Sequence, residues 1–266
     1  MTSINTHNNI IDHSQTLNKT SSQISSGKRI NSAADDAAGL AITSRFSSQI
    51  SAIQQAQRNG LEAKSLIETE QGALAGIAMG MQRLQELAIQ QGNGILNDAD
   101  RDILKLEAGQ ITQQINQIIE QSAFNDKPLF QQSSSSRELN FQLGDKATEV
   151  ISLAPNTTAE PIQQGLKQLD FSTQTAEVNL TELESLQQVV SVRRSELGAI
   201  NNNIDTSIER LSNEEENSQG ARSRIEDADI AKLVSQMVIE RIKQQAQLAL
   251  QSQANASTED TLRLLS

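Results

Sequence analysis

The sequence predicts a mainly α-helical protein: an elongated antiparallel bundle of long helices, with a terminal α-helical coiled coil and one small β-hairpin region. Hydrophobic residues are 36% and aromatic residues 2% of the 266 residues, which favours narrow helical seams over a thick sheet core. The prolines, Pro128, Pro155 and Pro161, all lie in the middle third, so long helices can propagate on both sides of it. Apolar residues also recur every seven positions over long stretches, as in packed helices.

The first expected helical segment is unusually poor in apolar residues. Ile10, Leu17 and Ile24 recur every seven residues, and mostly Asn, Ser, Thr and Gln lie between them. One apolar residue per heptad is too little for a stable isolated helix, so a partner helix must supply the missing burial.

Two long seams of the same period follow, and we expect them to pack antiparallel. The first ends at Gly92-Asn93-Gly94 and comprises Phe46, Ile53, Gly60, Ile67, Leu74, Met81 and Ala88. The second comprises Leu183, Val190, Leu197, Ile204 and Leu211, with Leu186 and Ile200 three positions later in the repeat. A shorter helix from Asp98 is expected between them, with a buried stripe of Leu104, Ala108, Ile111, Ile115 and Ile118.

The middle of the chain changes character. QQSSSS at 131–136 is a polar loop, and the alternation around Leu139, Phe141 and Leu143 before Gly144-Asp145 predicts a β-hairpin at about 138–153. A loose region is expected around Pro155 and Pro161, up to about Thr175.

The two ends of the chain are expected to pair with each other. The C-terminal segment is more apolar than the N-terminal one, with a stripe of Ile230, Val234, Val238, Ile242 and Ala246. We therefore predict a terminal coiled-coil domain formed by 1–32 and 233–266, and a core helical-bundle domain formed by 33–232.

The stretch NSAADDAAGLAI at 31–42 contains an acidic pair, Asp35 and Asp36. Such a pair can serve acid–base catalysis or hold a metal, but flanking alanines supply neither a third polar partner nor a pocket. Ser32 and Asp35 have the spacing of a helix capping box, so we expect Ser32 to cap a helix and both acids to lie at its positive end.

A second polar cluster, ARSRIEDAD at 221–229, is expected opposite this stretch if the chain ends pair. Arg224 and Asp227 have the spacing of an intrahelical ion pair. Arg222 and Arg224 are candidate partners for the two acids. Together these residues would mark the junction between the core bundle and the terminal pair.

Composition argues against several classes of function. The 22 Lys and Arg against 33 Asp and Glu give a net charge of −11, so neither nucleic acid nor an anionic membrane is an expected partner. There is no Cys, and the only histidines, His7 and His13, lie six apart, so no metal site and no cofactor is expected. No catalytic motif is present, and we predict that the protein is not an enzyme.

Three motifs resemble bacterial flagellin. SSGKRINSAADDAAGLAI at 25–42 is similar to the N-terminal signature of that family, and MQRLQELAIQ at 81–90 resembles its QRxRELAxQ segment. LGAINNNI at 197–204 followed by ARSRIEDAD at 221–229 resembles the C-terminal signature. The resemblance covers about residues 1–130 and 178–266, and it implies a short form without the large outer D2 and D3 insert domains.

The resemblance implies a structural subunit that polymerises with itself into the extracellular flagellar filament for motility. It implies export without a cleaved signal peptide, consistent with the absence of an apolar signal segment in residues 1–20. Implied partners are a flagellar export chaperone, the export apparatus, hook-associated and cap proteins, and Toll-like receptor 5. Gln82, Arg83 and Leu87 match the family's receptor-recognition surface and are candidates for receptor and subunit contacts.

Two other functions remain open at this point. A flagellar hook–filament junction protein shares the terminal architecture, and a non-flagellar secreted coiled-coil adaptor would show the same heptads.

Overall fold

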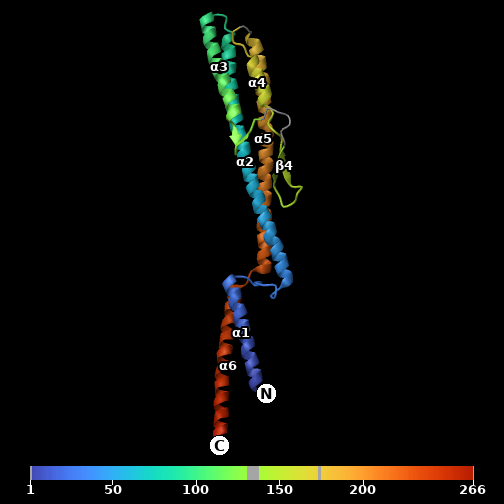
Figure 1. The fold of residues 1–266 in the computed structure, drawn as a ribbon, viewed down its shortest axis with the longest axis vertical. Coiled ribbons are helices and arrows are strands. Elements are labelled where there is room, and N and C mark those ends of the chain that lie inside the picture. The colour runs from blue at the N-terminus through green and yellow to red at the C-terminus, as the bar shows by residue number, and fades with distance from the viewer. Residues whose placement is uncertain (1, 131–137, 173–174, 266) are drawn as a thin grey trace. The chain divides into compact units, whose positions relative to one another are not determined.

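The computed structural model describes residues 2–130, 138–172 and 175–265, and the side chains of residues 13–257 within these ranges. The described chain is mainly α-helical, as predicted (Figure 1). Its helices are α1 (Thr2–Ser26), α2 (Ala37–Gln91), α3 (Asp98–Gln121), α4 (Ala159–Gln168), α5 (Ala176–Glu226) and α6 (Ile230–Leu265). Its strands are β1 (Ala123–Phe124), β2 (Lys127–Pro128), β3 (Leu139–Gln142) and β4 (Val150–Leu153).

The contacts divide the chain into two units, one formed by residues 52–214 and the other by 1–51 together with 215–266. The first is called here the bundle unit and the second the terminal unit. The domain boundaries expected from the sequence, 1–32 with 233–266 and 33–232, stay a prediction.

In the bundle unit, α2 and α5 pack antiparallel, as their common heptad period predicts. Three polar contacts join the two helices: Lys64–Asp205, Glu70–Arg193 and Gln85–Gln187. The residue numbers rise along α2 as they fall along α5, which shows the antiparallel arrangement. Most of the predicted seam residues are buried: Ile53, Ile67, Leu74, Met81 and Ala88 on α2, and Leu183, Val190, Leu197, Ile204 and Leu211 on α5. Phe46 and Ile200, also predicted, are only half-buried. Burial of these side chains is the main favourable term that holds the two helices together.

The shorter helices α3 and α4 complete the core of the bundle unit (Figure 1). The helix α3 begins at Asp98 as predicted, behind a capping box made by Asn97 and Asp100. Its buried stripe is Leu104, Ala108, Ile115 and Ile119, so Ile119 takes the fully buried place expected for Ile118, which is half-buried. The loose region expected around Pro161 is wrong, because α4 forms there; Ala159, Ile162, Gly165 and Leu166 have helical spacing and Pro161 lies in the first turn.

Two antiparallel strand pairs lie in the bundle unit. The predicted hairpin is β3–β4, with Leu139 opposite Leu153 and Phe141 opposite Ile151. The shorter pair β1–β2 was missed; its turn residues Asn125 and Asp126 have φ values of 50° and 61°. Asn and Asp tolerate this left-handed conformation better than most residues, which is the signal that could have revealed the turn. The predicted QQSSSS loop at 131–136 lies outside the described residues.

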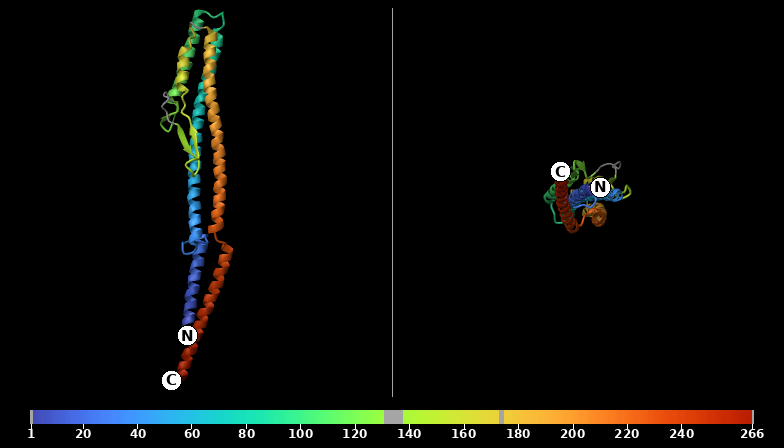
Figure 2. Two further views of the ribbon diagram at one scale, coloured as in Figure 1. Left: turned by 90° about the vertical axis from the view of Figure 1, so that its right-hand side faces the viewer. Right: turned by 90° about the horizontal axis from the view of Figure 1, so that it is seen from below.

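In the terminal unit, α1 and α6 lie side by side, as predicted for the two ends of the chain (Figure 2). The predicted α1 seam residues Leu17 and Ile24 are only half-buried, whereas Thr20 and Gln23 are buried; the side chain of Ile10 lies outside the described residues. No helix in the described part of the chain is both long and apolar enough to cross a membrane.

Candidate functional site

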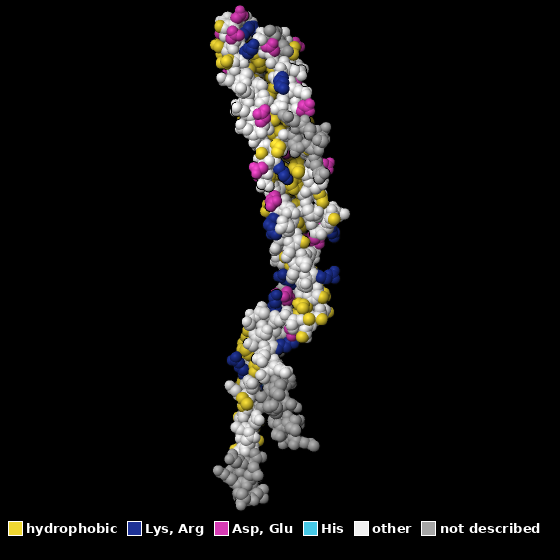
Figure 3. Space-filling model, viewed as in Figure 1, with side chains coloured by type: hydrophobic (Ala, Val, Ile, Leu, Met, Phe, Trp, Pro, Cys, Tyr) yellow, Lys and Arg dark blue, Asp and Glu magenta, His cyan; other side chains and the backbone are white. Residues whose placement is uncertain are grey.

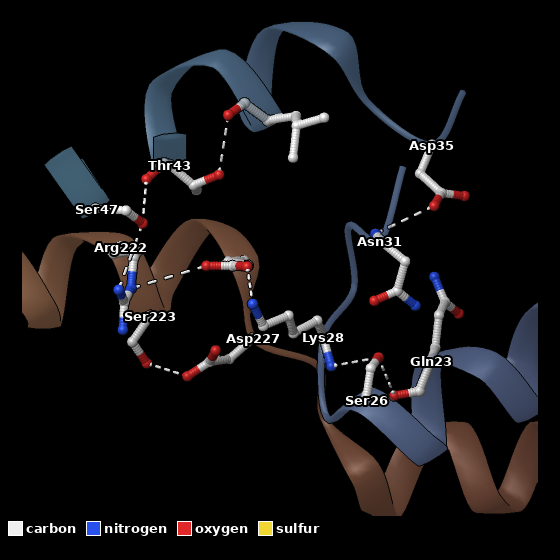
Figure 4. Close-up of polar contacts among 12 residues, drawn as sticks. Gln23, Ser26, Lys28, Asn31, Asp35, Thr43, Ser47, Arg222, Ser223 and Asp227 are labelled. Atoms are coloured by element: carbon white, nitrogen blue, oxygen red, sulfur yellow. Dashed lines mark hydrogen bonds and ion pairs between the residues drawn. The ribbon is translucent and has the colours of Figure 1, made fainter. Parts of the chain in front are cut away.

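The stretch NSAADDAAGLAI lies between α1 and α2, where residues 27–36 form a connecting segment. Gly27 ends α1 with a φ of 70°, a conformation that glycine adopts without strain. Backbone hydrogen bonds then tie this connection to the one between α5 and α6: Arg29 N donates to Glu226 O at 2.6 Å, and Ala228 N donates to Gly27 O at 3.0 Å. We call these paired connections the junction (Figure 4).

Ion pairs reinforce the junction, but they are not the predicted ones. Lys28 Nζ lies 2.5 Å from Glu226 Oε1, and Arg222 Nε lies 3.8 Å from the other oxygen of the same carboxylate. Arg222 also donates to Ser47 Oγ at 3.4 Å (Figure 4). The expected pairing of Arg222 and Arg224 with the two acids is therefore wrong.

Asp35 binds a lysine and backbone N–H groups within the terminal unit. Its carboxylate lies 2.9 Å from Lys19 Nζ on α1 and accepts from the backbone N–H groups of Asn31 and Ser32 at 3.2 and 3.1 Å. The pKa of Asp35 is lowered from 3.8 to about 2, mainly by the Lys19 contact and next by the hydrogen bond from the Asn31 N–H. Such an acid stays ionised and binds donors; it holds no proton that it could deliver in catalysis.

Asp36, and not Ser32, caps α2. The helix begins at Ala37, and Asp36 Oδ1 accepts from Gly39 N at 2.8 Å, as an N-cap side chain does. Ser32 instead begins an isolated turn closed by the Asp35 N–H donating to Ser32 O at 3.0 Å. The prediction failed because only half of a capping box forms: Asp35 Oδ2 accepts from Ser32 N, but Asp35 N donates to the Ser32 carbonyl and not to its hydroxyl, and the helix begins two residues later.

Gly39 completes the packing at the start of α2. A Cβ atom there would lie 2.5 Å from Asp36 Oδ2 and 2.6 Å from the Cδ1 atom of buried Ile30. The absence of a side chain thus lets the connection fold over the first turn of the helix, which accounts for the glycine in AADDAAG.

Asp227 accepts from Ser223 Oγ one helical turn earlier, at 2.5 Å. Among the described residues it makes no ion pair with Arg224, so the intrahelical pair expected from their spacing is wrong. Asp227 also faces Lys28 across the junction through a β-bridge (Figure 4).

His13 joins the two terminal helices, which the sequence analysis did not anticipate. Its Nδ1 lies 2.7 Å from Glu240 Oε2, and Lys243 Nζ lies 2.8 Å from the other carboxylate oxygen. Lys243, followed by His13, lowers the pKa of Glu240. The described residues contain no group of acids and histidines able to hold a metal ion, and the side chain of His7 lies outside them.

The predicted contact residues Gln82, Arg83 and Leu87 do not share one surface. Gln82 and Arg83 are exposed, and Arg83 binds Glu86 and Glu107, which raise its pKa. Leu87 is only 1% exposed and packs in the core of the bundle unit. Leu87 is therefore wrong as a surface contact, because it belongs to the apolar stripe of α2.

A buried polar network in the bundle unit was also missed. Glu70 and Arg193 are 2% and 5% exposed, and their side chains meet at 2.7 Å. Asn156 donates to Glu70 at 2.8 Å, and Arg193 donates to Ala154 O at 2.9 Å. Glu70 lies three positions after the seam residue Ile67, on the same side of α2, and a charge at such a position indicates a buried partner.

Large apolar side chains are exposed along the described part of α6. They are between 39% and 64% exposed: Ile230, Val234, Val238, Ile239, Ile242, Leu248 and Leu250. Some apolar side chains of this helix are visible in Figure 3. So many exposed large apolar side chains along one helix indicate a surface that binds another molecule.

Comparison with known proteins supplies the family. The family models for the bacterial flagellin N-terminal and C-terminal helical regions match residues 1–135 and 180–265. The flagellin of Halalkalibacterium halodurans is 34% identical over 264 residues, covering 98% of this chain and 96% of that protein. The flagellin of Bacillus subtilis is 32% identical over 296 residues, covering 98% of this chain and 97% of that protein.

Two solved structures have a similar fold. The crystal structure of Bacillus cereus flagellin matches with a TM-score of 0.50 and 26% identity, over 58% of this chain and 88% of that one. A putative flagellar hook-associated protein from Vibrio parahaemolyticus shares the fold alone, with a TM-score of 0.62 and 15% identity, over 73% of this chain and 100% of that one. The chain belongs to the bacterial flagellin family.

Proposed function

We propose that this flagellin joins its neighbours mainly through the terminal pair α1 and α6. As a flagellin it is a structural subunit, not an enzyme, and it polymerises into the extracellular flagellar filament. The exposed apolar side chains of α6 carry the proposal, since an isolated chain leaves them in water and a second copy would bury them.

The domain organisation proposed with this function is an inner coiled coil of residues 1–32 and 233–266 and a core bundle of residues 33–232. The small number of apolar side chains in α1 supports it, because that helix gains burial only from partners. The junction would then connect the part that assembles with the part that is stable alone.

The proposed partners beyond a second copy are those of other flagellins. They are an export chaperone, the export apparatus, hook-associated and cap proteins, and Toll-like receptor 5, with export requiring no cleaved signal. Gln82 and Arg83 stay candidates for receptor or subunit contact because both are exposed on α2.

Seeded polymerisation tests the proposal. Purified protein mixed with filament fragments should grow long helical filaments visible by electron microscopy. Val238→Asp on α6 should stop growth, because it places a charge in the apolar stripe. Val192→Asp on α5 is the matched control, since both valines are 47% exposed, and it should still polymerise.

Equal loss of growth in both variants would contradict the assignment of assembly to the terminal pair. Discrete soluble oligomers at every concentration of the unchanged protein would contradict the filament itself. That second result is expected of a coiled-coil adaptor or a junction protein, alternatives that full-length similarity to flagellins does not favour.

A further inference from the structure

The sequence contains two Asn-Gly pairs, Asn59-Gly60 and Asn93-Gly94, in very different surroundings. In such a pair the backbone nitrogen of the glycine can attack the side-chain amide carbon of the asparagine. The attack requires a backbone free to leave helical geometry and a nitrogen that is not otherwise bonded. Glycine favours it, because it has no Cβ to crowd the reacting atoms and reaches conformations closed to other residues.

Asn93 meets these requirements. It lies in the loop between α2 and α3, and both Asn93 and Gly94 are exposed. Apart from Gly94 itself and its two neighbours in the chain, no described residue has an atom within 4 Å of the place where a Cβ of Gly94 would be, and the described residues include no acceptor for its N–H. The Asn93 side chain already folds along the following backbone, where its Oδ1 accepts from Ile95 N at 3.4 Å.

Asn59 meets none of them. It lies inside α2, where its side chain donates to Gln142 O at 3.1 Å and accepts from Gln55 at 2.9 Å. The N–H of Gly60 belongs to the hydrogen-bonded ladder of the helix. Gly60 is also buried, and a Cβ there would lie 2.9 Å from Leu143 Cδ2.

We propose that Asn93 is a site of spontaneous deamidation in the folded protein and that the fold protects Asn59. A bond forms between Gly94 N and Asn93 Cγ, the Cγ–Nδ2 bond breaks, and the proton of the Gly94 N–H leaves with the amide as ammonia. Water then opens the succinimide ring at either carbonyl and leaves aspartate or isoaspartate. Water replaces ammonia overall, so no oxidant or reductant is required.

The product changes an exposed surface. It adds one carboxylate to a chain whose net charge is −11, two residues before Ile95, which is 86% exposed. The isoaspartate form also lengthens the backbone by one carbon within the loop that connects α2 to α3.

Peptide mapping of the full chain tests the proposal. After incubation at mildly alkaline pH, trypsin separates the sites, because cleavage after Arg58, Lys64, Arg83 and Arg101 yields peptides 59–64 and 84–101. In the native protein the mass increase of deamidation should accumulate in 84–101, with fragment ions placing it at Asn93, while 59–64 stays unchanged. In strong denaturant both peptides should react at similar rates.

Gly94→Ala is the matched variant. Its added methyl group enters open space, and among the described glycines only Gly27 has a positive φ, so the fold should persist. Reaction at Asn93 should slow by roughly tenfold, because the methyl group crowds the attacking nitrogen. Equal native rates at Asn59 and Asn93, an inert native Asn93, or an unchanged rate in Gly94→Ala would each overturn the proposal.

Discussion

At the residue scale, the two adjacent acids of the junction, Asp35 and Asp36, bind different partners. Asp36 caps α2 through the Gly39 N–H, whereas Asp35 binds Lys19 and the backbone of Asn31 and Ser32. Both side chains satisfy N–H groups that no helix or strand pairs, which is a stabilising role.

The cap assignment predicts the ranking of two substitutions. Asp36→Ala should cost about 0.5–2 kcal/mol of local helix stability, because the Gly39 N–H loses its acceptor. Ser32→Ala should cost less, since the exposed Ser32 hydroxyl contacts only Asp35. Hydrogen exchange of the first-turn amides of α2 measures both, and greater loss of protection in Ser32→Ala would contradict the assignment.

Asp35 predicts a specific pH dependence. Its pKa is about 2 in the folded chain and 3.8 ordinarily, so folding favours the charged form. Its contribution to stability is therefore fully present above pH 3.8 and is lost as the pH falls through about 2. NMR titration of the carboxyl carbon should show the low midpoint, and Lys19→Ala should raise it toward 3.8; an unmoved midpoint would show that Lys19 is not the cause.

At the scale of elements, α2 and α5 are joined by two kinds of polar contact within an apolar seam. The Glu70–Arg193 ion pair is buried. Glu70 also accepts a hydrogen bond from Asn156, and Arg193 donates one to Ala154 O. The Lys64–Asp205 pair spans the same two helices at the surface, at 2.7 Å. The distance between the charged atoms is the same in the two pairs, but the Glu70–Arg193 pair is buried and has further hydrogen-bond partners.

This difference predicts unequal effects of removing one partner. Arg193→Leu should destabilise the bundle unit by about 3–5 kcal/mol, because Glu70 would remain as an uncompensated buried charge. Asp205→Ala should have a far smaller effect, since exposed ion pairs contribute little. Urea denaturation followed by circular dichroism measures both.

A double variant provides the control for Arg193→Leu. Replacing Glu70 and Arg193 together with leucine should recover much of the loss, since no charge is then left buried. Equal urea midpoints for Arg193→Leu and Asp205→Ala would contradict the prediction. They would show that water or another cation compensates the Glu70 charge when Arg193 is removed.

At the scale of the whole molecule, the terminal and bundle units differ in how completely each buries its own apolar side chains. The core of the bundle unit draws residues from α2, α3, α4 and α5. In the terminal unit, Thr20 and Gln23 are among the buried residues of α1, and much of the apolar stripe of α6 is in water. Regions with little apolar burial open readily.

We therefore expect the termini to become ordered on assembly. Amides of residues 1–32 and about 233–266 should exchange hydrogen rapidly in the monomer and slowly in the filament, while the α2 amides of 60–88 stay protected in both. Hydrogen–deuterium exchange with mass spectrometry makes the comparison. Strong protection of the termini in the monomer would show that α1 and α6 are stable without neighbours.

The sequence by itself determined the helices other than α4, the antiparallel seam of α2 and α5, the pairing of the chain ends, the β3–β4 hairpin and the family. These features depend on short-range periodicity, turn residues and motifs, which are visible in one dimension. It missed α4 and β1–β2, where the segments are short and the signals weak.

Tertiary structure alone decided which groups meet. Arg193 and Glu70 lie 123 positions apart, and His13 and Glu240 lie 227 apart, so no local pattern couples them. The same reason explains why Arg222 and Arg224 were wrong as partners of the two acids. The error over Ser32 is local, because Asp36 four residues later caps the helix. Asp35 binds Lys19 because the connection to α2 lies beside α1, which carries that lysine.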